Sequence, residues 1–404
     1  MPIKVVAAAA CHKRPMSTAA LRRAYLGPAL FSFGFRPFFL FGAAWAALSV
    51  PIWVWSFLGG SAPMAHRDWH VHEMLFGYLA AIVAGFLTTA VPNWTGRMPV
   101  IGAPLAGLVL LWVAGRIAML SAWWVGPAAA VIDAAFLLAF AGVIWREILA
   151  GRNWRNLPVC ALVTVLALAN VAFHVDATVW RTGVGERAAL GAITVLLCLI
   201  GGRITPSFTR NWLRARRLTT EPAAFGPVDR ATLALTVLGA VAWTAFPQHP
   251  ATGAVLLAAG AANLVRVARW RGWAAASEPL VWILHVGYAW LGVGLVLLGA
   301  SRFTDAIPQT AGVHAVTAGA IGVMTLAVMT RATRGHTGRP LAADGATVGL
   351  YAAVNAAALL RLIAPFAGAG QPGLLMGSAM LWVIAFGGFC LVYGPMLITR
   401  RTAA

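Results

Sequence analysis

The stretch Trp69-His70-Val71-His72-Glu73-Met74 opens an apolar run that continues to Val91. A run of about 20 apolar residues is long enough to cross a bilayer as a helix. Ionisable side chains are costly inside a membrane, so the two histidines and the glutamate at the entrance of this run are candidates for function. The stretch therefore predicts a membrane-spanning helix with a binding site near one end.

The composition of the whole chain agrees with a membrane protein. Of the 404 residues, 60% are hydrophobic and only 10% are charged, whereas a soluble domain carries about 25% charged residues. The net charge of +19 would by itself suggest a nucleic-acid partner. The Lys and Arg residues, however, lie in short segments between apolar runs, which is typical of membrane topology. Nucleic-acid binding is therefore excluded.

Twelve apolar runs are bounded by charged or turn-forming residues, and each is long enough to span a membrane. They predict helices over 38–58, 71–92, 101–120, 125–145, 157–178, 188–206, 231–247, 251–269, 278–300, 310–332, 342–365 and 373–398. We number these spans 1 to 12. The expected fold class is all-α, a polytopic transmembrane helical bundle of about 12 spans. Residues 1–37 would form a basic cytoplasmic tail, 38–398 a single membrane domain and 399–404 a second cytoplasmic tail.

The positions of Lys and Arg predict the orientation. With the N-terminus inside, 24 of the 30 Lys and Arg residues lie on the inner side. The other six lie on the outer side: Arg67, Arg116, Arg181, Arg187, Arg302 and Arg361. Cytoplasmic loops carry the excess of positive charge in membrane proteins. We therefore expect both termini in the cytoplasm. The alanine-rich segment 1–23 is interpreted as an uncleaved tail.

The four cysteines predict no redox or metal motif. Cys11, Cys160, Cys198 and Cys390 are far apart in the sequence, and none forms a CxxC pair. We expect them to behave as small buried hydrophobes.

Several histidines gather at one depth once the topology is assigned. The outer ends of the spans and their turns contain His66, His70, His72, His174, His249 and His314. A haem between two helices needs one axial histidine from each at matching depth, and His72 and His314 both lie about a turn below the outer edge. We expect this pair to ligate a cofactor. The alternative for either residue alone is an interfacial hydrogen bond.

His70 and Glu73 flank this predicted ligand. Two helical steps turn the chain by about 200°, so His70 and His72 cannot share one face. His70 is therefore a candidate for a second metal or haem. Glu73 lies three residues from His70, where it could orient an imidazole or relay protons.

Two more histidines lie at other depths relative to the membrane. His285 is about 10 Å inside span 9, one turn before Tyr288, and would act as a ligand, as a proton relay or in a helix–helix hydrogen bond. His336 lies in Arg334-Gly335-His336-Thr337-Gly338-Arg339-Pro340. This segment is either an ordinary positive inner loop or a metal site in which Arg339 binds haem propionates.

The remaining polar residues within spans are assigned structural roles. His174 and His249 are not expected to bind a ligand, because Asp176 would satisfy His174. Four residues are expected to form hydrogen bonds between helices: Asp133, Asn170, Asn263 and Asn355.

Several long motifs lie between about residues 25 and 400 of the chain. They are 33–40 (FGFRPFFL), 70–78 (HVHEMLFGY), 85–97 (GFLTTAVPNWTGR), 202–209 (GRITPSFT), 285–290 (HVGYAW), and His314-Ala315 with 335–340 (GHTGRP). Together these motifs resemble the NnrS family. The resemblance implies a bacterial inner-membrane protein that binds haem and copper and acts in nitric-oxide metabolism or resistance. It identifies the expected cofactor as haem b, with copper or a second haem beside it.

A looser similarity links the chain to haem–copper oxidase core subunits, which carry haem histidines on spans 2 and 10 as His72 and His314 do here. The similarity is one of fold alone. That superfamily also has adjacent histidines in span 7 for copper, and span 7 of this chain contains none. A copper site of that form is not expected.

Three functions are compatible with these patterns. The first is a redox metalloprotein that binds or reduces nitric oxide at haem, with His70, His285 and His336 available to a second metal and with Glu73 and Tyr288 as catalytic residues. Its electrons would come from a quinol or a separate protein. The second is a transporter of a small solute, metal or haem, which would show repeats, although the two halves share no obvious motif. The third is a signalling protein, for which the short loops offer little docking surface.

Overall fold

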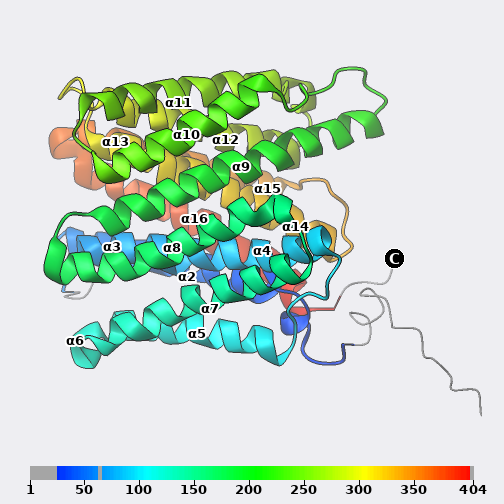
Figure 1. Ribbon diagram of the computed structural model, residues 1–404, viewed down its shortest axis with the longest axis horizontal. Coiled ribbons are helices and arrows are strands. Elements are labelled where there is room, and N and C mark those ends of the chain that lie inside the picture. Colours follow the sequence, from blue (N-terminus) through cyan, green and yellow to red (C-terminus); the bar gives the residue numbers. More distant parts are fainter. Residues whose placement is uncertain (1–24, 62–65, 401–404) are drawn as a thin grey trace, which may run out of the picture.

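The protein is a bundle of long apolar helices. The computed structural model describes residues 25–61 and 66–400, and these residues form helices and no strand. Twelve of the helical segments are long and apolar enough to cross a membrane (Figure 1). The predicted fold class, an all-α membrane bundle of twelve spans, is confirmed.

The bounds of the spans follow. Span 1 is α2 (Phe35–Phe57), and span 2 consists of α3 (Arg67–His72), η2 (Glu73–Leu79) and α4 (Ala80–Thr95). Spans 3 to 5 are α5 (Ala103–Leu120), α7 (Ala128–Ala150) and α8 (Leu157–Val175) with η4 (Asp176–Trp180). Spans 6 to 9 are α9 (Val184–Ala215), α10 (Pro227–Ala245), α11 (Pro250–Arg269) and α12 (Pro279–Ala300). Span 10 consists of α13 (Gln309–His314), η6 (Ala315–Ile321) and α14 (Gly322–His336), and spans 11 and 12 are α15 (Gly345–Ile363) and α16 (Gln371–Ile398).

The ends of the spans differ from the predicted ones where polar residues continue a helix. Span 6 reaches Ala215 rather than residue 206, because helical hydrogen bonding continues where hydropathy falls at Arg210 and Arg214. The first helix α2 begins and the last helix α16 ends at the same end of the bundle (Figure 1), as an even number of spans requires. Most of the predicted N-terminal tail, with Cys11 and His12, and residues 401–404 lie outside the described residues.

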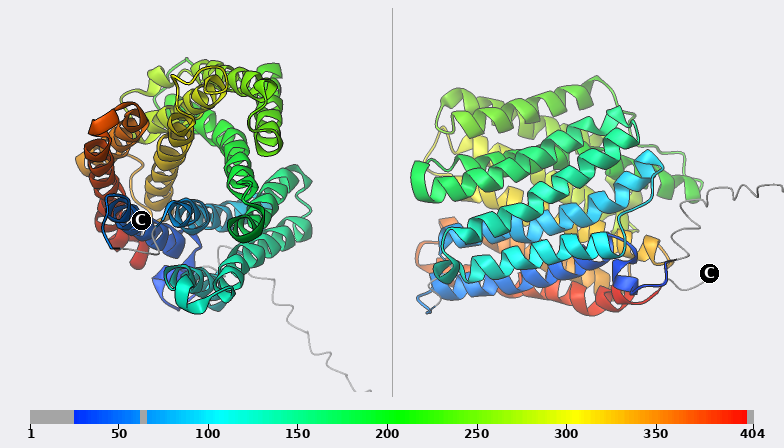
Figure 2. Two further views of the ribbon diagram at one scale, coloured as in Figure 1. Left: turned by 90° about the vertical axis from the view of Figure 1, so that its left-hand side faces the viewer. Right: turned by 60° about the horizontal axis from the view of Figure 1, so that its bottom comes forward.

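Spans 2, 6 and 10 form the centre of the bundle. Their apolar windows are 83%, 67% and 72% buried, and every other span is less buried than these three. An apolar cleft lies between them, lined by residues that include Ile82, Ile193 and Met324. The remaining helices surround this core (Figure 2). Side chains that span 2 directs away from the cleft therefore meet neighbouring helices rather than lipid.

Spans 2 and 10 repeat one another in structure and in sequence. Each begins with a six-residue α-helix that ends at a histidine, continues through a seven-residue π-helical segment and resumes as an α-helix. The histidines His72 and His314 are 242 residues apart, and at the same spacing Thr95-Gly96-Arg97 matches Thr337-Gly338-Arg339. Gly96 and Gly338 both have positive φ, 70° and 79°, as residues that terminate helices commonly do. The sequence predicts no obvious motif shared between the two halves, and this repeat corrects that expectation.

A capping aspartate stabilises the helix that follows span 10. The Asp344 carboxylate accepts hydrogen bonds from the Thr347 backbone N–H at 2.9 Å and the Thr347 hydroxyl at 2.7 Å, and it also pairs with Arg334. The Thr347 hydroxyl bond, then the backbone bond and the Arg334 charge, lower the pKa of Asp344. Because the folded pKa is the lower one, the stabilisation is complete above the unfolded value of about 3.9 and is lost as the pH falls through the folded value.

We expect Asp344→Ala to lower the free energy of unfolding at neutral pH by about 1 kcal/mol, the usual contribution of a helix cap. The difference from the wild type should shrink as the pH falls below about 4. Thermal unfolding in detergent at several pH values measures both effects. Asp305→Ala is the control, because Asp305 is exposed in the turn before span 10. A difference that is independent of pH would contradict the prediction.

Candidate metal centre

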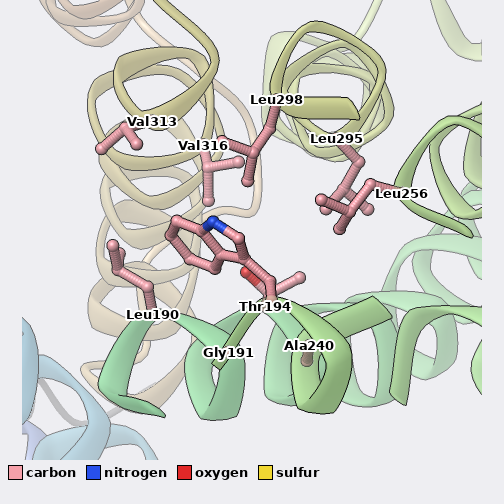
Figure 3. Close-up of a pocket in the computed structure, with 10 residues that line it drawn as sticks. Leu190, Gly191, Thr194, Ala240, Leu256, Leu295, Leu298, Val313 and Val316 are labelled. Carbon is pink, nitrogen blue, oxygen red and sulfur yellow. The ribbon is translucent and has the colours of Figure 1, made fainter. Parts of the chain in front are cut away.

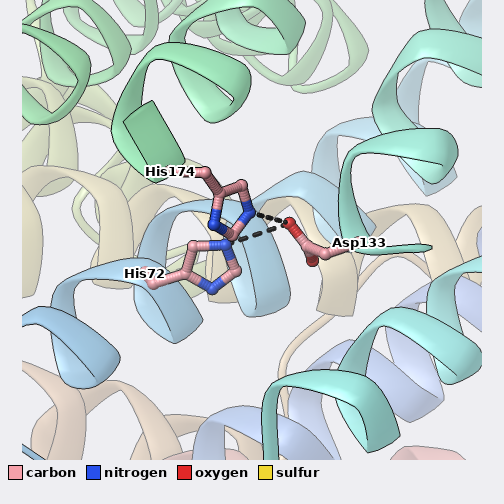
Figure 4. A group of neighbouring side chains, drawn as sticks. All are labelled: His72, Asp133 and His174. Atoms are coloured by element: carbon pink, nitrogen blue, oxygen red, sulfur yellow. Dashed lines mark hydrogen bonds and ion pairs between the residues drawn. The ribbon is translucent and has the colours of Figure 1, made fainter. Parts of the chain in front are cut away.

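Three side chains from three spans meet near one end of the bundle. His72 ends α3, Asp133 lies in the second turn of α7, and His174 lies near the end of α8 (Figure 4). The Asp133 Oδ2 atom lies 3.0 Å from His72 Nε2 and 3.0 Å from His174 Nε2. One potential ligand atom from each residue lies within 4.8 Å of the other two. The cluster joins spans 2, 4 and 5 at the end predicted to be outer.

Irregular helix geometry positions these side chains. The α-helix of span 2 changes to a π-helix directly after His72, and that of span 5 changes to a π-helix directly after Val175, next to His174. Such segments are uncommon and frequently occur at functional sites. The consecutive side chains of His72 and Glu73 are both fully buried as a result.

A second layer of hydrogen bonds holds His72 in place. Glu73 Oε1 lies 2.9 Å from His72 Nδ1, and Glu73 Oε2 accepts a bond of 2.7 Å from Trp45 Nε1. Arg116 donates to Glu73 and, through its other terminal nitrogen, to Asp133. The glutamate thus fixes the Nδ1 side of the ring, which leaves Nε2 facing Asp133. A metal-binding histidine is commonly oriented by a carboxylate in this way.

Gly77 provides the room that this arrangement needs. A Cβ atom at Gly77 would lie 2.8 Å from Arg116 Nη1, from Glu73 Oε2 and from Trp45 Nε1. Only glycine therefore allows the guanidinium, the carboxylate and the indole to converge beside span 2.

The charges of the cluster leave a place for one cation. Glu73 and Asp133 carry two negative charges, and Arg116 supplies one positive charge. The remaining negative charge is buried in an apolar bundle, where an unbalanced charge is costly. A protonated imidazole would balance it with one positive charge, and a divalent metal ion would more than offset it; the two alternatives differ in composition and can be distinguished by metal analysis.

The donor atoms fit a first-row transition metal. Ligands at about 2.1 Å from a common ion lie about 3.0–3.4 Å from one another, and the two imidazole nitrogens lie 3.0 Å from the Asp133 oxygen. Two histidines and one carboxylate with open positions are the ligand set of non-haem iron sites, and imidazole also suits copper and zinc. The amide oxygen of Asn170 lies 3.2 Å from His72 Nε2 and therefore adjoins the position that a metal ion would occupy.

The other predicted outer histidines lie on a different side of span 2. The His70 ring stacks on Trp53, with centroids 4.1 Å apart and an interplanar angle of 22°, and its Nδ1 is buried without a hydrogen-bond partner. His314 Nδ1 lies 2.7 Å from the Thr310 carbonyl oxygen. His314 ends α13, which packs against α15, and Arg361 of α15 lies over the Trp53 ring on which His70 stacks. His70, rather than His72, therefore lies on the side of span 2 toward spans 10 and 11.

The predicted residues of the inner loop lie at the opposite end of span 10. His336 packs on the rings of Phe33 and Phe35, with centroids 5.5 Å and 5.4 Å apart. It ends α14, whereas His314 ends α13. The 22 residue steps from His314 to His336 correspond to about 33 Å of helix. Arg339, which follows His336, therefore does not share a site with His314.

His285 and Tyr288 lie in a third region, among spans 6 to 9. His285 Nε2 is 2.8 Å from the Thr209 hydroxyl, and its Nδ1 is buried without a partner. The Tyr288 hydroxyl donates to Asn263 Oδ1 at 2.7 Å and accepts from Arg266 at 2.8 Å. The structure does not bring either residue to the cluster at His72.

The cavities of the described residues contain little that could do chemistry. One pocket lies among α9 to α13 and η6 and is lined by aliphatic side chains such as Leu190, Leu256 and Leu298, with Thr194 as a polar member (Figure 3). The cleft between spans 2, 6 and 10 is similarly apolar. The polar clusters, rather than these cavities, are the candidates for function.

The sequence predicts only part of the centre at His72. The predicted hydrogen bonds between helices are confirmed for Asp133 and Asn170, since the Asn170 amide donates to Asp133 Oδ2 at 2.8 Å, but neither residue is predicted as part of a metal site. The sequence predicts that Asp176 satisfies His174 and that Arg116 is only an outer charge. Asp176 instead accepts bonds from Thr182 and Gly185. Matching the depths of Arg116, Asp133 and His174 in their spans would have indicated that they meet.

The fold and this centre define a multi-pass helical membrane protein with a buried histidine–carboxylate site. The chain belongs to the NnrS family, because residues 29–401 match the family described as NnrS protein. No curated protein matches the chain.

Proposed function

We propose that this protein is a metalloprotein of the bacterial inner membrane that binds nitric oxide, or reduces it, at a metal held by His72, Asp133 and His174. The observation that carries the proposal is the convergence of these three ligand atoms, with Glu73 oriented behind His72. Membership of the NnrS family supports nitric oxide as the ligand. The role is in nitric-oxide metabolism or in defence against nitrosative stress.

The residues of the site have separate tasks in this proposal. His72, His174 and Asp133 would hold the metal, which would supply open coordination positions for nitric oxide. Glu73 holds the imidazole of His72 in the tautomer that exposes Nε2. Arg116 pairs with both carboxylates and so holds them in position. The surrounding helices exclude water.

A haem b would complete the proposed function, and His314 would be one of the two residues that hold it. The other would be His70, since both nitrogens of His72 already contact side chains of the cluster, whereas His70 Nδ1 has no partner. A haem with two histidine ligands transfers electrons. A quinol or a separate protein would supply them, and copper is the alternative metal for the site at His72.

Metal analysis of the purified protein tests the proposal. We expect about one first-row metal ion per chain beside haem. His174→Ala should lower the metal content at least tenfold, as loss of a ligand does, and should abolish the spectroscopic signal of nitric oxide bound there. His249→Ala is the matched control, because His249 is an exposed cap of α11. A metal-free wild type, or equal metal in both variants, would contradict the assignment.

A transporter is the second candidate, and one observation favours it. Spans 2 and 10 form a repeat with interrupted α-helices, and transporters commonly contain repeats and discontinuous helices at their binding sites. Uptake of a metal or haem into proteoliposomes, without a tightly bound cofactor in the protein, would support this function.

A further inference from the structure

A second polar cluster lies at the same end of the bundle, between spans 1, 2, 10 and 11. Arg361 lies near the end of α15, which packs against α13, the helix that ends at His314. Its guanidinium carbon lies 5.7 Å from the centre of the Trp53 ring, on which His70 stacks. These side chains form a positively charged patch, which we call the Arg361 cluster.

Arg361 has no anionic partner among residues 25–61 and 66–400. The described side chains and carbonyls give it no hydrogen bond and no ion pair, and its contact with Trp53 is a cation–π interaction. Arg67, by contrast, is paired with Asp68 at 2.9 Å and Glu186 at 2.8 Å. The unbalanced charge of the cluster is therefore that of Arg361, which is half-buried.

The repeat of spans 2 and 10 shows what this cluster lacks. Arg116 of span 3 is neutralised by Glu73, which directly follows His72. In span 10 the residue that directly follows His314 is Ala315, and span 11 still contributes Arg361. The arrangement at span 10 thus has a histidine and, on the next span, an arginine, but no acid directly after the histidine. A guanidinium without a partner is costly in an apolar bundle, so an anion from outside the chain would stabilise it.

We propose that Arg361 binds an anionic group with two coplanar oxygens, beside the two histidines. A guanidinium presents parallel N–H donors that match such a group. Two sources are distinguished by the test: a free nitrite ion and the carboxylate of a tetrapyrrole side chain, the second of which rests on the haem proposed above for His70 and His314. The site is separate from the metal centre at His72, and its existence does not depend on a metal there.

Titration of the purified full-length protein in detergent tests the site. Calorimetry with sodium nitrite, against sodium chloride at equal ionic strength, detects a free oxyanion. Absorbance titrations with haem and with haem dimethyl ester, in which the carboxylates are blocked, detect a tetrapyrrole side chain. We expect Arg361→Gln to weaken either nitrite binding or the preference for haem over its ester at least tenfold. Arg361→Lys, which keeps the charge but not the paired donors, should have an intermediate effect.

Controls distinguish the site from a general effect on the protein. Arg302→Gln is the matched variant, because Arg302 lies at the same end but bonds to Gln248 and Gln309, and it should bind as the wild type does. His174→Ala should also leave the anion site intact. The proposal is overturned if the wild type prefers neither nitrite over chloride nor haem over its ester. It is equally overturned if Arg361→Gln, with unchanged melting temperature, binds as the wild type does.

Discussion

Replacing Arg116 by methionine is expected to lower the free energy of unfolding by about 3–5 kcal/mol, the cost of breaking a buried ion pair. The guanidinium bonds both Glu73 and Asp133, and all three side chains are nearly or fully buried. Without it, two carboxylates remain in an apolar bundle with no fixed cation. Thermal or denaturant unfolding of the purified protein in detergent measures the loss.

Two further variants identify the cause of this loss. Arg146→Met removes an arginine from an ion pair with Glu147, but Arg146 is 63% exposed, so the expected change is at most about 1 kcal/mol. Adding Glu73→Gln and Asp133→Asn to Arg116→Met removes both unbalanced charges and should restore part of the stability. If Arg116→Met is as stable as Arg146→Met, the buried network does not stabilise the fold as described.

The second large effect is expected in the haem spectrum. Replacing His314 by alanine should abolish the Soret band of the protein, because an axial ligand is lost. His70→Ala should do the same. His72→Ala should keep the Soret band and lose the non-haem metal. Absorption spectra and metal analysis of the three purified variants together assign each histidine to its cofactor.

The pattern of results discriminates between the two pairings. A Soret band that survives in His70→Ala and disappears in His72→Ala would mean that His72 and His314 bind the haem, as depth alone predicts. A band that survives loss of both His72 and His314 would contradict both pairings. His66→Ala is the control, because His66 is exposed at the start of α3, where it accepts a bond from Trp69 N–H.

Most of the fold could be predicted from the sequence, because a membrane helix depends on a local property. Each span is an apolar run closed by polar residues, and neither feature requires knowledge of the other spans. The helix ends were less predictable: α9 continues beyond its apolar part to Ala215. The repeat was missed because residues between the shared positions differ almost completely, and the common π-helical geometry is not visible in the sequence.

The site could be predicted only in part. His72 and Glu73 attract attention because they are charged or polar at the start of an apolar run. Asp133 contacts His72 across 61 residues of sequence, and nothing local to α7 shows which span it faces. The direction in which a side chain points around its helix determines which neighbouring helix it contacts. Directions calculated for a regular α-helix do not hold for residues next to a π-helical segment. Depth predicts that His314 lies level with the start of span 2, but it cannot choose between His70 and His72.

The π-helical segment after His72 makes span 2 sensitive to chain length. Each N–H there bonds a carbonyl five residues back instead of four, so the segment accommodates a residue that a regular helix would not. Removing that residue would turn everything before Glu73 by about 100° relative to α4. His70 and His72 would then both leave their partners, and the spacing to His314 would also change. The same argument applies to η6 in span 10. The two histidine sites are therefore defined by residue count as much as by residue type, and a single deletion would remove both from a helix that still crosses the membrane.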